Sequence, residues 1–181
     1  MKTPVCPTPS LDCRIADARN RLYRVALAWC GDAMLADDLV QETLSAGIAK
    51  KSQLRDEKKL YAWLYSILHN QWNSYLRSKK PHDILDDQLA SEESGPIEDS
   101  EQAEIIQRVR QAIATLPMTE RQVIALVDLD ELSYCDVAEV LEIPIGTVMS
   151  RLHRARKRLL DKMEHAEPGR KANRKTIRLV E

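Results

Sequence analysis

The sequence predicts an all-α protein of two small helical domains joined by a flexible acidic linker. The first observation is composition, since 181 residues include only 5 Gly and no Phe, and chains poor in Gly and aromatics are typically helical. The second is the segment 81–101, rich in Pro, Ser and acids and too polar to bury a core. The third is the three-to-four-residue spacing of apolar residues on both sides of that segment.

Charge is distributed unevenly along the chain. The formal net charge of −1 hides +5 over residues 1–81, −9 over 82–107, zero over 108–164 and +3 over 165–181. Two neutral-to-basic parts therefore flank an acidic one, a pattern compatible with nucleic-acid binding despite the near-zero total. Residues 1–10 lack the apolar core of a signal peptide, and no apolar run reaches the ~18 residues of a membrane span. A soluble, cytoplasmic protein is expected.

The first domain is predicted to contain two long helices. Asp32 is placed to cap a helix that runs to Ile48 and carries an acidic outer stripe. After a polar break at 50–58, a second helix follows over 60–77. Its predicted outer face holds Tyr65, Ser66, His69, Asn73 and Arg77, with Trp72 on one flank. Such a face suits stacking against single-stranded bases, although a solvated surface is the simpler interpretation of the pattern alone.

The second domain is predicted to begin with a helix over 105–116, followed by another from Thr119. Ser133 and Asp136 have the spacing of a capping box at the start of a short helix that ends near Leu141. Pro144 and Gly146 then mark a tight turn before a basic helix, whose buried positions are Val148, Leu152, Ala155 and Leu159.

This order predicts a helix-turn-helix whose second helix enters the major groove of DNA. Ser150, His153, Arg154 and Lys157 point outward, where they suit base edges. Arg151, Arg156 and Arg158 lie on the flanks, within reach of phosphates. The short first helix, the Pro/Gly turn and the basic second helix agree, so we prefer DNA binding to a merely solvated charged face.

Two motif blocks resemble the extracytoplasmic-function (ECF, group 4) sigma factors of the sigma-70 family. The stretch from Leu116 to Leu159, with LSY, DVAEVL, GTV, SRL and RAR in order, is similar to region 4 of that group. DDLVQETL is similar to region 2.2, and LYAWLYSILHNQWNSYLR to regions 2.3 and 2.4. The resemblance covers about residues 15–163, and two ordered blocks on either side of an acidic linker are a specific signal.

Composition and the resemblance together divide the chain into five parts, of which the resemblance leaves the two termini unexplained. They are a flexible N-terminus (1–14), sigma region 2 (15–80), the acidic linker (81–101), the region 4 helix-turn-helix (102–165) and a basic tail (166–181). Core-polymerase binding is implied for Asp37, Asp38, Gln41 and Glu42. Binding of the −10 element is implied for Trp63, Tyr65, Ser66, Asn70, Asn73 and Arg77. Binding of the −35 element is implied for Thr147, Met149, Ser150, Arg151, His153, Arg154 and Lys157.

The family further implies an alternative sigma factor, a non-catalytic specificity subunit of bacterial RNA polymerase in transcription initiation. Its partners would be the clamp of the largest polymerase subunit, the flap of the second-largest, duplex −35 and single-stranded −10 promoter DNA, and an anti-sigma factor. Met149 replaces a commonly basic residue, and Glu142 stands where a glycine often ends a helix. The promoter sequence and the conformation of that turn therefore stay open.

No enzyme, cofactor or metal site is expected. The four His and four Cys lack metal-ligand spacing, and no phosphate-binding loop or nucleophile elbow occurs. Two other classes of function remain. A stand-alone dimeric helix-turn-helix regulator would explain only residues 102–163 and leave DDLVQETL as coincidence. A pure interaction protein that sequesters another sigma factor would have no use for the basic helix.

Overall fold

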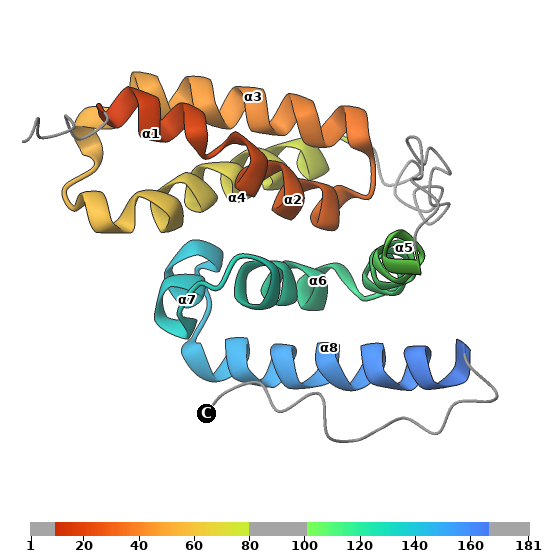
Figure 1. Ribbon diagram of the computed structural model, residues 1–181. Coiled ribbons are helices and arrows are strands. Elements are labelled where there is room, and N and C mark those ends of the chain that lie inside the picture. The colour runs from red at the N-terminus through yellow and green to blue at the C-terminus, as the bar shows by residue number, and fades with distance from the viewer. Residues whose placement is uncertain (1–9, 80–100, 167–181) are drawn as a thin grey trace, which may run out of the picture.

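The computed structural model describes residues 10–79 and 101–166, which form helices and no strand within these ranges (Figure 1). The N-terminal domain consists of α1 (Leu11–Asp17), α2 (Arg19–Cys30), α3 (Ala33–Ala49), the 3₁₀ turns η1 (Lys51–Gln53) and η2 (Glu57–Lys59), and α4 (Leu60–Ser78). The C-terminal domain consists of α5 (Glu101–Ala114), α6 (Met118–Ile124), the π-helical turn η3 (Ala125–Leu129), α7 (Tyr134–Leu141) and α8 (Ile145–Ala166). The predicted all-α class with two helical domains is confirmed. Most of the predicted tails and nearly all of the linker lie outside the described residues, but α1 begins inside the N-terminal segment 1–14 that was expected to be flexible.

Short-range sequence signals set several of these helix ends. The Asp32 carboxylate accepts hydrogen bonds from the backbone N–H groups of Met34 (2.8 Å) and Leu35 (3.0 Å), which caps α3 as predicted. At the start of α7, the Ser133 hydroxyl accepts from the Asp136 N–H (3.1 Å) and donates to its carboxylate (2.6 Å). The helix predicted to begin near Thr119 begins at Met118, but Thr119 does not cap it, because Pro117 holds the cap position and makes no side-chain hydrogen bond.

The N-terminal domain encloses its core between α2, α3 and α4. Helices α1 and α2, which the sequence analysis did not delimit, contribute Ile15, Leu22, Val25 and Trp29 to this core. Gly47 in α3 allows α4 to approach closely, since a Cβ atom there would lie 2.9 Å from the Leu64 side chain. The approach of α3 to α4 positions the two predicted functional helices of this domain.

In the C-terminal domain, α7 and α8 form the predicted helix-turn-helix and pack together with α6. Of the predicted inward positions of α8, Val148, Leu152 and Ala155 are at most 3% exposed, and Leu159 is partly buried. Glu142 ends α7 with φ 54° and ψ 43°, so the turn keeps the left-handed conformation although the residue is not glycine.

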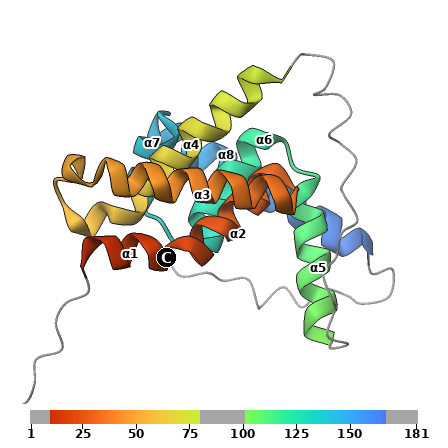
Figure 2. The same ribbon diagram turned by 90° about the horizontal axis from the view of Figure 1, so that it is seen from above.

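The two domains pack directly on each other. Figure 1 shows α6 and α7 between the N-terminal domain and α8, and Figure 2 gives the same arrangement from above. Helix α4 packs on α7, and α2 packs on α6, η3 and α5. One cluster of buried apolar residues includes members of both domains. We call this packing of the two domains on each other the closed arrangement. It buries some of the surfaces that the sequence predicts to be exposed and leaves others accessible.

Candidate nucleic-acid and polymerase interfaces

The predicted −35 residues share one accessible face of α8. Met149, Ser150, His153, Arg154 and Lys157 are exposed, and Thr147 and Arg151 are partly exposed. Between residues 145 and 160 the helix carries five cationic residues and no acid. Figure 1 places α8 on the side of the molecule away from the N-terminal domain. A duplex therefore has access to this face in the arrangement observed.

Buried and half-buried acids hold three arginines of α8 in place. The Glu120 side chain on α6 is 5% exposed and lies 3.3 Å from Nε of Arg154 and 3.2 Å from Nε of Arg158. On the flank, Asp128 accepts two hydrogen bonds from Arg156 (2.6 and 3.1 Å) and thereby raises the pKa of that guanidinium. Sequence reasoning missed Glu120, because its partners follow 34 and 38 residues later and no short motif joins them.

The predicted −10 residues are divided by the closed arrangement. Asn70 and Arg77 are exposed, and Trp63, Ser66 and Asn73 are partly buried. Tyr65 is fully buried, and burial together with the negative charge of Asp130 raises the pKa of its hydroxyl.

The predicted outer face of α4 is thus wrong for Tyr65, His69 and Trp72, which are 0%, 9% and 4% exposed. Tyr65 lies beside Asp130 of the C-terminal domain, whereas the His69 ring packs edge-on against Trp29 of its own domain, with centroids 6.1 Å apart. Periodicity along the helix shows neither neighbour. Burial lowers the pKa of His69, whose Nε2 lies 3.1 Å from the Asn73 amide. Trp72 stacks in parallel on Tyr75 with ring centroids 5.7 Å apart.

The predicted polymerase-binding residues lie on α3. Asp38, Gln41 and Glu42 are exposed, whereas Asp37 is half-buried and accepts a 2.7 Å hydrogen bond from Arg19. Met34 is 78% exposed one turn before Asp38. An exposed Met beside acids and an amide can contribute both apolar contact and ion pairs to a partner surface.

Residues 10–79 and 101–166 contain no cluster of side chains suited to a metal ion. No group of three or more His, Cys, Asp or Glu side chains could hold a metal ion there. The Cys30 thiol donates a hydrogen bond to the Asp32 carbonyl (3.2 Å), and burial raises its pKa to about 11, which is unlike a reactive thiolate. Among the helices so described, none is long and apolar enough to cross a membrane.

Comparison with known proteins gives matches for both domains. The family model described as "Sigma-70 region 2" matches residues 15–82, and the one described as "Sigma-70, region 4" matches residues 106–159. The ECF RNA polymerase sigma factor SigW of Bacillus subtilis (strain 168) is 30% identical over 153 residues, covering 78% of this chain and 82% of that protein. The ECF RNA polymerase sigma factor EcfG of Rhodopseudomonas palustris (strain TIE-1) is 33% identical over 153 residues and covers 84% of each chain.

Two solved structures share the fold. The sigma factor RpoE in complex with the anti-sigma factor NepR, from Bartonella quintana, matches with a TM-score of 0.70 and 29% identity. The alignment covers 86% of this chain and 97% of that one. CnrH in complex with the cytosolic domain of CnrY matches with a TM-score of 0.61 over 86% of this chain and 88% of that one. Its 21% identity supports likeness of fold only.

Proposed function

The chain belongs to the ECF sigma factors of the sigma-70 family, and we propose that it is an alternative sigma factor that directs core RNA polymerase to particular promoters. In this role it is a specificity subunit without catalysis of its own. The observation that carries the proposal is the exposed face of α8, where polar and cationic side chains project from a helix-turn-helix whose opposite face is buried.

The C-terminal domain binds the duplex −35 element. Arg154 and Lys157 reach base edges, with Ser150 and His153 beside them, and Arg151 contacts phosphate at the flank. Met149 contributes an apolar contact, for which the thymine methyl group is the natural partner in the major groove. Glu120 orients Arg154 and Arg158 and limits their rotamers before DNA arrives.

The N-terminal domain holds the single-stranded −10 element along α4. Asn70 and Arg77 are accessible in the arrangement observed, and Tyr65 becomes available once the domains separate. Bases that leave the duplex stack on the aromatic rings, which offsets the unstacking cost of roughly a few kcal/mol. Melting of promoter DNA is promoted in this way.

Core polymerase is bound by both domains. The α3 face with Asp38, Gln41 and Glu42 meets the clamp of the largest subunit, where an acidic surface suits basic partners. The C-terminal domain meets the flap of the second-largest subunit. The RpoE of the solved complex binds an anti-sigma factor while sharing 29% identity with this chain, which supports regulation of this chain by an inhibitor of the same class.

Transcript mapping tests the proposal. Purified protein is mixed with core RNA polymerase and fragmented host DNA, and the 5′ ends of the transcripts are sequenced. We expect new start sites that require the protein and share two upstream elements. Arg154→Ala should remove starts that depend on the −35 element while the variant still binds core. If the wild-type protein neither binds core nor produces new starts, the proposal fails, and a stand-alone regulator takes its place.

A further inference from the structure

The side of α4 that the proposed function assigns to single-stranded DNA is covered by α7 of the C-terminal domain. Tyr65 and Trp72 are 0% and 4% exposed on this side. Bases can stack on either ring only after α7 has moved away from α4. The contacts that hold the C-terminal domain against the N-terminal domain therefore compete with promoter binding.

Arg21 on α2 makes the most extensive of these contacts. Its Nε and Nη2 each lie 2.9 Å from one oxygen of the Asp130 carboxylate, and Nη2 also donates to the Asp130 carbonyl (3.1 Å). The Asp130 side chain is 1% exposed, and the guanidinium lies 3.8 Å above the Tyr61 ring. A bidentate pair of this kind raises the pKa of Arg21, so the residue is cationic at any relevant pH.

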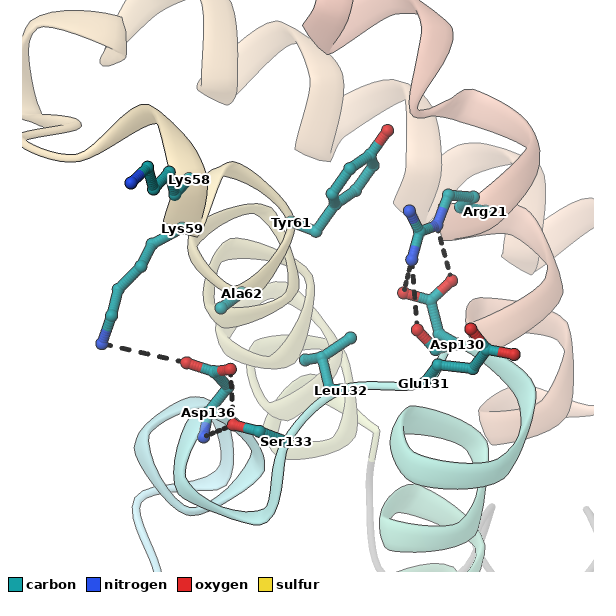
Figure 3. Close-up of a pocket in the computed structure, with 10 residues that line it drawn as sticks. All are labelled: Arg21, Lys58, Lys59, Tyr61, Ala62, Asp130, Glu131, Leu132, Ser133 and Asp136. Atoms are coloured by element: carbon teal, nitrogen blue, oxygen red, sulfur yellow. Dashed lines mark hydrogen bonds and ion pairs between the residues drawn. The ribbon is translucent and has the colours of Figure 1, made fainter. Parts of the chain in front are cut away.

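A second set of charges faces across the same interface at the start of α4. Lys59 Nζ lies 2.9 Å from the Glu139 carboxylate and 3.8 Å from that of Asp136. These acids occupy one edge of α7, three residues apart. Figure 3 shows Lys59 facing Asp136, with Lys58 next to Lys59 on the N-terminal domain. Lys58, Lys59 and Arg21 line a cavity of about 190 Å³ together with Asp130 and Asp136.

The cations belong to the N-terminal domain and the acids to the C-terminal domain. We infer that Arg21, Lys58 and Lys59 form a binding site for the backbone phosphates of single-stranded DNA, which the carboxylates of Asp130, Asp136 and Glu139 occupy in the closed chain. The inference rests on the proposed function and adds a phosphate site beside the base-binding face of α4. It also makes the C-terminal domain a competitor of DNA for that site.

Phosphate groups of DNA can replace the carboxylates as partners of these cations without loss of hydrogen bonds. Carboxylate and phosphate oxygens accept the same hydrogen bonds, and the planar fork of Arg21 fits either one in bidentate fashion. When the domains separate, Arg21 and Lys59 each replace a carboxylate with a phosphate and are not left unpaired. Opening simultaneously exposes Tyr65 and Trp72 to bases. Phosphate binding and base stacking are therefore coupled through one movement of α7 away from α4.

Removal of two carboxylates tests the competition. The full chain and its variant Asp136→Asn/Glu139→Gln are titrated with a fluorescein-labelled, mixed-sequence, 20-nucleotide single-stranded DNA at several salt concentrations. Because the variant loses the closing ion pairs at Lys59, we expect it to bind the oligonucleotide roughly fivefold more tightly at low salt. Small-angle X-ray scattering should show a larger radius of gyration for the variant than for the wild type.

A matched variant separates this effect from a simple change in net charge. Asp12→Asn/Asp17→Asn raises the net charge equally and also frees a lysine, since Asp12 pairs with Lys51 at 2.7 Å. Its affinity should rise less than the interface variant's, and its radius of gyration should stay that of the wild type. Equal gains by both pairs would overturn the inference.

The salt dependence identifies the cation that binds phosphate. Adding Lys59→Gln to the interface variant should reduce the slope of log affinity against log salt by about 0.7, the value for one phosphate contact on a single strand. An unchanged slope would contradict the assignment of Lys59. Wild-type protein that directs new transcripts with core polymerase, while the interface variant gains no affinity, would sink the inference but leave the proposed function standing.

Discussion

Two glutamates adopt backbone conformations that glycine adopts more easily. Glu131 has φ 58° and Glu142 has φ 54°, in the left-handed region that costs an ordinary residue roughly 1–2 kcal/mol. Glu142 ends α7, and its N–H bonds back to the Glu139 carbonyl at 3.4 Å while that of Ile143 reaches Ala138 at 3.1 Å. These hydrogen bonds and the packing of α7 on α8 hold the turn in spite of the strain.

A glycine in place of Glu142 would relieve this backbone strain. Glu142→Gly should raise the free energy of unfolding by about 1 kcal/mol, because glycine adopts this conformation without a Cβ clash. Urea denaturation measures the change. Glu142→Ala removes the same carboxylate but keeps the Cβ atom, and it should bring no gain. If alanine stabilises as much as glycine, the carboxylate rather than the backbone is the source of the cost.

Helix α8 combines the face proposed to read bases with a buried carboxylate that orients two of its arginines. Glu120 is buried on α6, yet it lies beside two arginines that are themselves about half exposed. The carboxylate contacts no DNA in the proposed complex and acts through Arg154 as a positioning residue. Glu120 should therefore affect the preference for one DNA sequence over another more than the overall affinity for DNA.

Glu120→Gln should therefore lower the preference of the holoenzyme for a −35 duplex over a scrambled duplex by about tenfold, the scale of one well-placed base contact. Competition between the two duplexes measures this ratio. Asp128→Asn also frees an arginine, Arg156, but on the flank of α8, and it should change the ratio much less. Similar losses in both variants would refute a specific orienting role for Glu120.

At the scale of the whole molecule, the two domains share buried apolar residues and polar links. Arg121 on α6 donates to the carbonyl of Trp29 (3.0 Å) in the N-terminal domain and to those of Ala114 (2.6 Å) and Leu116 (3.1 Å) in its own. Burial lowers the pKa of this guanidinium. One charged group thus satisfies three carbonyls around the junction of α2, α5 and α6.

We expect the wild-type chain to unfold in one calorimetric transition and Arg121→Met to unfold in two. The methionine keeps much of the side-chain volume but loses three charge-assisted hydrogen bonds, so the variant should be about 2–4 kcal/mol less stable. Lys51→Met is the control, because it removes an exposed ion pair that is worth at most about 1 kcal/mol. A single transition with an unchanged midpoint in Arg121→Met would show that the domains are joined by other contacts.

Sequence alone determined the parts of this protein that depend on neighbours along the chain. The Asp32 cap of α3, the Ser133 cap of α7 and the inward face of α8 follow from spacings of two to four residues, because a helix brings such residues together whatever surrounds it. The helix-turn-helix and the exposed face of α8 were predictable for the same reason. The order of the two motif blocks along the sequence was enough to indicate the ECF sigma factor family.

Only the tertiary structure decided how the two domains meet. Arg21 pairs with Asp130 across 109 residues, Glu120 with Arg154 across 34, and Tyr65 lies on a face that its own helix periodicity predicts to be exposed. Many acids in the chain could pair with Arg21, and no local rule selects one. The selection arises when α7 packs on α4, since burial then favours the one arrangement in which each enclosed charge has a partner.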